Sequence, residues 1–102
     1  MEQQWRQGDV LVARVERVPD EARPTGETVL FRGEATGHAH RLEASGESAV
    51  LALDDWLFLR IDGAGARLVH EEHGPIPLDA GVYRVWRQRE FDPTRHAVPI
   101  RD

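Results

Sequence analysis

The chain of 102 residues contains no cysteine. Disulfide bonds and thiolate ligands are therefore excluded, and a metal ion bound to this chain must be held by histidine or carboxylate side chains. Long apolar runs are also missing, because the longest (residues 49–53) is far shorter than the roughly 20 residues of a membrane-spanning helix. The first residues, Met-Glu-Gln-Gln-Trp-Arg-Gln-Gly, include no apolar stretch typical of a signal peptide. We therefore expect a cytoplasmic protein with no membrane partner.

Lysine is absent as well, so all 13 basic residues are arginine; with 18 acidic residues the net charge is -5. The arginines are spread along the chain and alternate with aspartate and glutamate. Proteins that bind nucleic acid through its phosphates usually have a basic patch and a raised pI. The sequence pI of about 5.5 therefore disfavours nucleic acid as a partner.

Helical periodicity is the third missing feature. No stretch of about a dozen residues both lacks glycine and proline and repeats its apolar residues every 3.6 positions, so no long helix is expected. Turn residues instead recur at short intervals, as in all-β proteins. We predict a single all-β domain over residues 1–102, a small barrel or sandwich of about seven mostly antiparallel strands, with residues 93–102 as a loosely ordered tail.

The expected strands alternate with recognisable turns. Residues 45–47 predict a hairpin turn, and residues 62–65, which begin with Asp-Gly, give the strongest turn signal. Residues 74–78 contain two prolines and cannot form a helix or a central strand. The last strand has no cleanly apolar face, which favours an edge or intersubunit position. The strands are expected at residues 10–18, 28–32, 38–43, 48–53, 56–61, 66–72 and 82–91.

Four of the five histidines form two closely spaced pairs, His38-Ala39-His40 and His70-Glu71-Glu72-His73. Residues i and i+2 of a strand point to the same face, so His38 and His40 should project together. His70 ends an expected strand, and His73 can fold back toward it as the chain turns. A divalent transition metal needs three or four such ligands at about 2.0–2.2 Å, which two pairs on adjacent strands would supply.

We therefore predict a metal site formed by His38, His40, His70 and His73. Zinc is the first candidate for this ligand set, and copper, nickel and iron also bind imidazole. Glu72 lies between two of these residues and is the candidate for a further ligand or a general base. Four imidazoles on one ion would make a closed structural site, whereas three would leave a position for an activated water.

The alternative is a non-catalytic interaction module whose histidines are incidental, since each pair is also typical of solvated strands and turns. Trp56 begins an apolar strand and should pack in the core, whereas Trp5 and Trp86 favour a contact surface. Unpaired strand edges also promote association, so we expect a homo-oligomer. Arg87 and Arg89 lie on one face of their strand and suit either a solvated interface or an anionic ligand.

Two resemblances accompany these patterns. Gly33 and the pair His38-Ala39-His40 resemble the first motif of the cupins, and residues 74–81 look like the proline-glycine turn of their second motif. No histidine follows Gly81 where the cupin pattern has one, so this resemblance implies only a cupin-like, metal-lined barrel. The segments GHAHRL, HEEHGPI and RQREF together are similar to a group of small bacterial β proteins of unknown function, which implies no activity.

Overall fold

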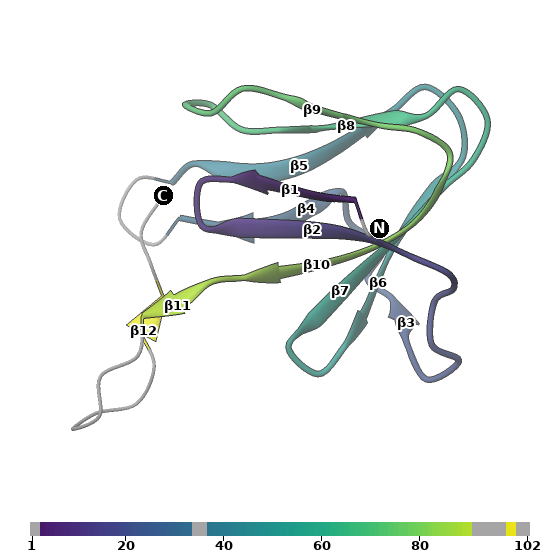
Figure 1. Cartoon of the computed structure of the whole chain (residues 1–102), viewed down its shortest axis with the longest axis horizontal. Helices are drawn as coiled ribbons and strands as arrows, with labels where there is room; N and C mark the ends of the chain where they lie inside the picture. Colours follow the sequence, from purple (N-terminus) through teal and green to yellow (C-terminus); the bar gives the residue numbers. More distant parts are fainter. Residues whose placement is uncertain (1–2, 34–36, 91–97, 100–102) are drawn as a thin grey trace.

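A computed structural model describes residues 3–33, 37–90 and 98–99 (Figure 1). The described residues form two main antiparallel sheets that face each other as a sandwich, with no helix and no closed barrel. The all-β prediction is therefore confirmed, in its sandwich form. The six-stranded sheet contains, in spatial order, β1 (Gln4–Gln7), β2 (Val10–Val15), β10 (Gly81–Arg87), β7 (Trp56–Ile61), β6 (Ser48–Leu53) and β3 (Arg23–Pro24). The four-stranded sheet contains β4 (Val29–Arg32), β5 (Ala39–Ala44), β8 (Ala66–Val69) and β9 (Ile76–Leu78).

Alternating apolar residues of both sheets form the core between them, as expected where each sheet buries one face. Tyr83, Val85 and Leu59 are completely buried there. A smaller apolar cluster of Ala22, Leu51 and Phe58 lies apart from this core. The main core consists of Val10, Val12, Leu30, Leu42, Val50, Leu59, Ile61, Leu68, Ile76, Leu78, Tyr83 and Val85.

The turns at residues 45–47 and 62–65 carry the chain from one sheet to the other. The predicted hairpin at residues 45–47 is wrong, because β5 pairs with β8 and β6 pairs with β7. Leu42 of β5 and Val50 of β6 approach the same core from opposite layers, which a hairpin within one sheet would not allow. In the second turn Gly65 has φ +88, and an added Cβ would lie 2.7 Å from the carbonyl oxygen of Leu78, so only glycine fits.

The strand β10 occupies a central position between β2 and β7, so the prediction of an edge strand is wrong. Its inward residues Tyr83 and Val85 are fully buried, while the guanidinium of Arg84 covers the rings of Trp56 and Trp86. The mixed polarity of this segment therefore has a structural reason: one face of the strand is buried in the core, and on the other face an arginine covers the tryptophan rings. The proline-containing β9 forms an edge of its sheet, where Pro77 removes no required donor.

Several strand ends differ from the sequence-based expectation. β2 ends at Val15, and β8 ends at Val69, three residues before the expected Glu72. The expected strand over residues 82–91 divides into β10 and β11 (Arg89–Glu90), and β11 pairs with β12 (Val98–Pro99). The predicted loose tail at residues 93–102 otherwise lies outside the described residues.

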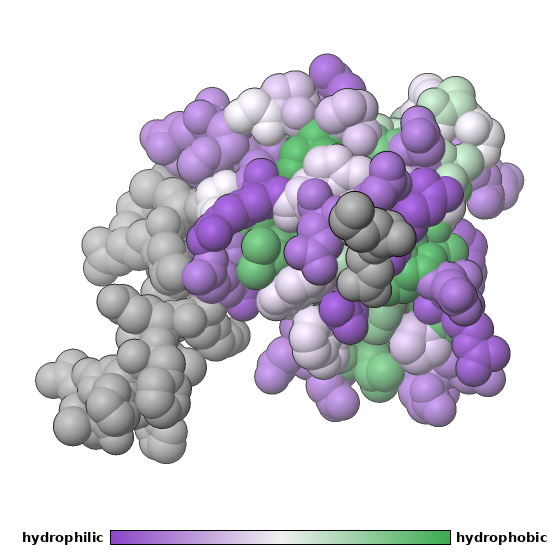
Figure 2. Space-filling view, viewed as in Figure 1, coloured by the Kyte–Doolittle hydropathy of each residue, from purple (hydrophilic) through white to green (hydrophobic). Residues whose placement is uncertain are grey.

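The surface seen in Figure 2 is mainly hydrophilic, with small apolar areas between hydrophilic residues. Trp56, which the sequence predicted to be in the core, is 39% exposed. Its place at the first position of β7, next to the two-residue turn of Asp54 and Asp55, explains this exposure. Within the described ranges there is no helix whose length and apolarity would let it cross a membrane.

Candidate metal centre

The two histidine segments meet where β5 and β8 pair. His40 lies within β5, and His70 directly follows β8. Arg41 pairs with Val69. Because the strands are antiparallel, His40, one residue before Arg41, lies next to His70, one residue after Val69. His38 directly precedes β5, and His73 lies in the bend between β8 and β9. Residues far apart in the chain are therefore neighbours in space.

The rings of the four histidines His38, His40, His70 and His73, called here the four-histidine cluster, contact one another. His70 is central, with ring centroids 5.5 Å from His38, 4.4 Å from His40 and 4.6 Å from His73. The rings of His40 and His73 are nearly parallel, 6.4 Å apart. His40 and His70 are buried, whereas His38 and His73 are partly exposed. The cluster therefore extends from the core to the surface.

Three side chains of types that could hold a metal ion lie close together within and beside this cluster. One donor atom each of His38, His70 and Glu71 lies within 4.8 Å of the others. The backbone N–H of Ala39 donates a hydrogen bond of 2.9 Å to Oε2 of Glu71. This bond, together with the backbone N–H of Glu71 itself, holds the pKa of the Glu71 carboxyl below its usual value. The carboxylate is therefore ionised at neutral pH, as metal ligation requires.

Glu72, the predicted ligand or base, lies further out. The expected strand over residues 66–72 would have placed Glu72 on the same face as His70, but β8 ends at Val69, so the two side chains do not share a strand face. Its side chain is 60% exposed, and Oε1 lies 3.5 Å from Nδ1 of His38. Its backbone N–H donates a hydrogen bond of 3.0 Å to Nδ1 of His70. Glu71, which the sequence analysis did not select, is the acidic residue that joins the ligand group.

Three further polar side chains, Gln7, Asp9 and Arg87, are linked to His40 directly or through one another, and the sequence has no distinctive pattern at Gln7 or Asp9. Nδ1 of His40 lies 2.8 Å from Oε1 of the buried Gln7. Oδ1 of the buried Asp9 lies 3.7 Å from Nε2 of His40, and Oδ2 lies 2.9 Å from Nε of Arg87. Arg87 also donates to the carbonyl of Arg32 and covers the ring of Phe31. Arg87 is thus held inside the protein, while the side chain of Arg89 lies outside the described part.

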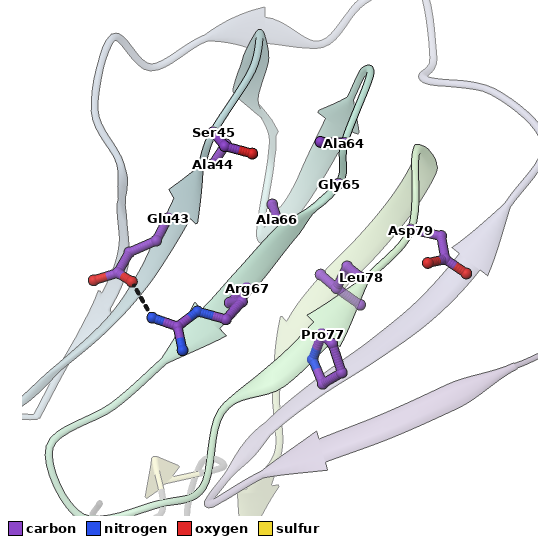
Figure 3. A pocket seen from close by; sticks show the side chains of 10 residues that line it. All are labelled: Glu43, Ala44, Ser45, Ala64, Gly65, Ala66, Arg67, Pro77, Leu78 and Asp79. Carbon is purple, nitrogen blue, oxygen red and sulfur yellow. Dashed lines mark hydrogen bonds and ion pairs between the residues drawn. The ribbon is translucent and has the colours of Figure 1, made fainter.

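A surface groove of about 490 Å³ lies elsewhere, over β5, β8 and β9 (Figure 3). Glu43 and Arg67 form an ion pair of 2.8 Å on its wall, and both side chains are more than half exposed. Exposed pairs of this kind contribute little energy. No histidine lines the groove, and the remaining lining residues are small or apolar, apart from Ser45 and Asp79. The four-histidine cluster is therefore the better candidate for chemistry.

Fold and side chains together define a small β-sandwich domain with a cluster of imidazoles and a carboxylate where β5 meets β8. The chain belongs to the family described as a domain of unknown function (DUF8820), which matches residues 6–88. This range includes the four-histidine cluster and Gln7, Asp9, Glu71 and Arg87. Neither the curated proteins nor the solved structures gave a match.

Proposed function

We propose that this protein is a small metal-binding β domain whose four-histidine cluster holds one divalent ion, with zinc as the preferred metal. The observation that carries the proposal is the meeting of two histidine segments around His70. Histidines that are merely solvated have no reason to pack their rings together from separate strands.

The ring spacing suits coordination of a common ion. Imidazoles bound to one tetrahedral zinc ion at about 2.0–2.1 Å have ring centroids about 5 Å apart. The ring separations given above range from 4.4 to 6.4 Å, on either side of that value. Small side-chain rotations would therefore suffice for ligation, without movement of the strands.

His38, His70 and Glu71 form the starting ligand set of the proposed site, because their donor atoms are grouped most closely. Two imidazoles and one carboxylate bind zinc in hydrolytic enzymes and iron(II) in oxygenases, and both leave coordination positions open. His40 and His73 are the further donors. Either of them would bring the ligand count to four and close the site, and Glu72 at the rim would act as a base only if a position stayed open.

Metal titration tests the proposal directly. Protein purified without an affinity tag should take up one equivalent of Zn²⁺ per chain, measured by competition with a chromophoric chelator and by elemental analysis. Free zinc at 100 times the dissociation constant should stabilise the fold by about 2.7 kcal/mol, because the ion binds the folded state. Iron(II), nickel and copper in the same assay would establish the preference. Less than one equivalent, unchanged after zinc addition, would exclude the proposal.

A second candidate function is self-association through an aromatic patch, which we define as Trp56, Trp86 and Arg84. The two indole rings lie 5.7 Å apart, and the Arg84 guanidinium covers them at 4.8 and 4.9 Å. A cavity of about 210 Å³, lined by both tryptophans and Phe31, adjoins the patch. Tryptophan and arginine are among the residues most enriched at interface hot spots. A second copy of the chain is the proposed partner.

Self-association predicts a melting temperature and a sedimentation coefficient that rise with protein concentration. Trp56→Ser should abolish both dependences, because it removes the exposed ring from the patch. Arg60→Ser is the matched control, since Arg60 is an exposed residue on the same strand outside the patch. A wild-type protein that is monomeric at every concentration would contradict this second function and would leave the metal proposal unaffected.

A further inference from the structure

The buried side chain of Gln7 joins both histidine segments. Its amide nitrogen donates hydrogen bonds of 2.9 Å to the carbonyls of Leu68 and Gly74, which flank the segment that carries His70 and His73. An amide NH₂ group has two hydrogens, and these two carbonyls use both. The orientation of the amide is therefore fixed by chemistry, and Oε1 must be the atom that faces His40.

This orientation determines which ring nitrogen of His40 carries the hydrogen. Oε1 of Gln7 can only accept, so Nδ1 of His40, 2.8 Å away, must carry a hydrogen. The neutral ring then has its lone pair on Nε2. Asp9 favours the other tautomer, because a carboxylate near Nε2 stabilises a proton on that nitrogen. At 3.7 Å, however, Oδ1 of Asp9 lies beyond ordinary hydrogen-bond distance.

We infer that Gln7 is the positioning residue of the four-histidine cluster, and that it presents Nε2 of His40 as a ligand atom. Histidines that ligate metals usually donate their other ring N–H to a fixed acceptor, which sets the tautomer and the ring orientation. Gln7 supplies that acceptor and holds both ends of the second histidine segment. The inference rests on the proposed function, and it adds His40 to the ligand set through a named atom.

The tautomer of His40 can be measured without metal. In the ¹⁵N NMR spectrum of metal-free wild-type protein at mildly alkaline pH, Nδ1 of His40 should have the shift of a protonated ring nitrogen and Nε2 that of an unprotonated one. A spectrum with the proton on Nε2 would overturn the inference. This measurement requires no substitution, so it does not depend on whether a variant folds.

Two substitutions of Gln7 separate its roles. Gln7→Met keeps the volume but offers only a weakly accepting thioether in place of the amide oxygen, so the His40 proton should move to Nε2, toward Asp9. Gln7→Glu retains an acceptor and should keep the Nδ1–H tautomer. The zinc affinity of Gln7→Met should fall about 10- to 100-fold, the usual effect of losing an outer-shell partner. Gln4→Met, an exposed change on the same strand, is the matched control and should bind zinc as wild type does.

The outcomes distinguish the inference from the proposed function. Unchanged zinc affinity in folded Gln7→Met, or the same tautomer in both Gln7 variants, would overturn the role of Gln7. Wild-type protein that binds no ion would instead overturn the proposed function, whichever tautomer His40 has.

Discussion

Alanine in place of His70 is expected to lower the affinity for Zn²⁺ by roughly 100-fold or more, a larger loss than the 10- to 100-fold typical of outer-shell changes. The ring of His70 contacts those of the three others, and His70 belongs to the group with His38 and Glu71. Its removal would therefore leave the remaining donors without their common neighbour. Competition with a chromophoric chelator, performed on the wild type and the variant side by side, measures the loss.

Ligation by His70 also has a structural consequence that the wild type can report. The N–H of Glu72 donates to Nδ1 of His70, so the neutral ring has its own hydrogen on Nε2. Either nitrogen can bind an ion only if the Glu72 N–H loses this acceptor. Zinc addition should therefore shift the Glu72 amide resonance and speed its hydrogen exchange. An unchanged Glu72 amide in zinc-loaded protein would show that His70 is not a ligand.

His96→Ala is the matched control for His70→Ala, because His96 is the fifth histidine and belongs to neither pair. The control should bind zinc with wild-type affinity. Circular dichroism and denaturation of the metal-free His70→Ala protein establish that its fold is retained. Equal affinities of the two variants would mean that the cluster is not the binding site.

The sequence predicts the strands well and their arrangement poorly. Strands at residues 48–53 and 56–61 agree with the structure, because a short polar turn separates two runs of β-forming residues. The same reasoning placed residues 45–47 in a hairpin, although that turn joins two sheets. A turn-forming sequence predicts that the chain changes direction. The sheet that the next strand joins depends on which distant strand offers a complementary face. Here that strand is β8 for β5.

For the candidate site, too, the sequence predicts local features better than long-range contacts. The short spacing within each histidine pair is a local pattern, and it selected four side chains whose rings lie together in the structure. Glu71 was missed because period-two alternation was extended to Glu72, beyond the end of β8 at Val69. Gln7 and Asp9 were missed for another reason: an isolated glutamine or aspartate near the N-terminus has no periodicity, and its role arises only from long-range contacts.

Alanine in place of Asp9 is expected to destabilise the metal-free protein by about 3–5 kcal/mol, the usual cost of removing one partner of a buried ion pair. The carboxylate of Asp9 is fully buried, and the side chain of Arg87 beside it is only 13% exposed. Without Asp9, Arg87 would keep its hydrogen bond to the Arg32 carbonyl but would lose the opposite charge that compensates its desolvation. Chemical denaturation at neutral pH measures the difference in unfolding free energy.

Asp62→Ala, a change at an exposed turn residue, is the matched control and should alter stability by no more than about 0.5 kcal/mol. Arg87→Met in the Asp9→Ala background should recover part of the lost stability, because it removes the uncompensated buried charge and retains an apolar side chain against Phe31. If Arg87→Met destabilised the wild type and the Asp9→Ala protein equally, the two side chains would be energetically independent. Asp9 would then act through His40 or the β1–β2 turn, and its effect should appear in zinc affinity instead of stability.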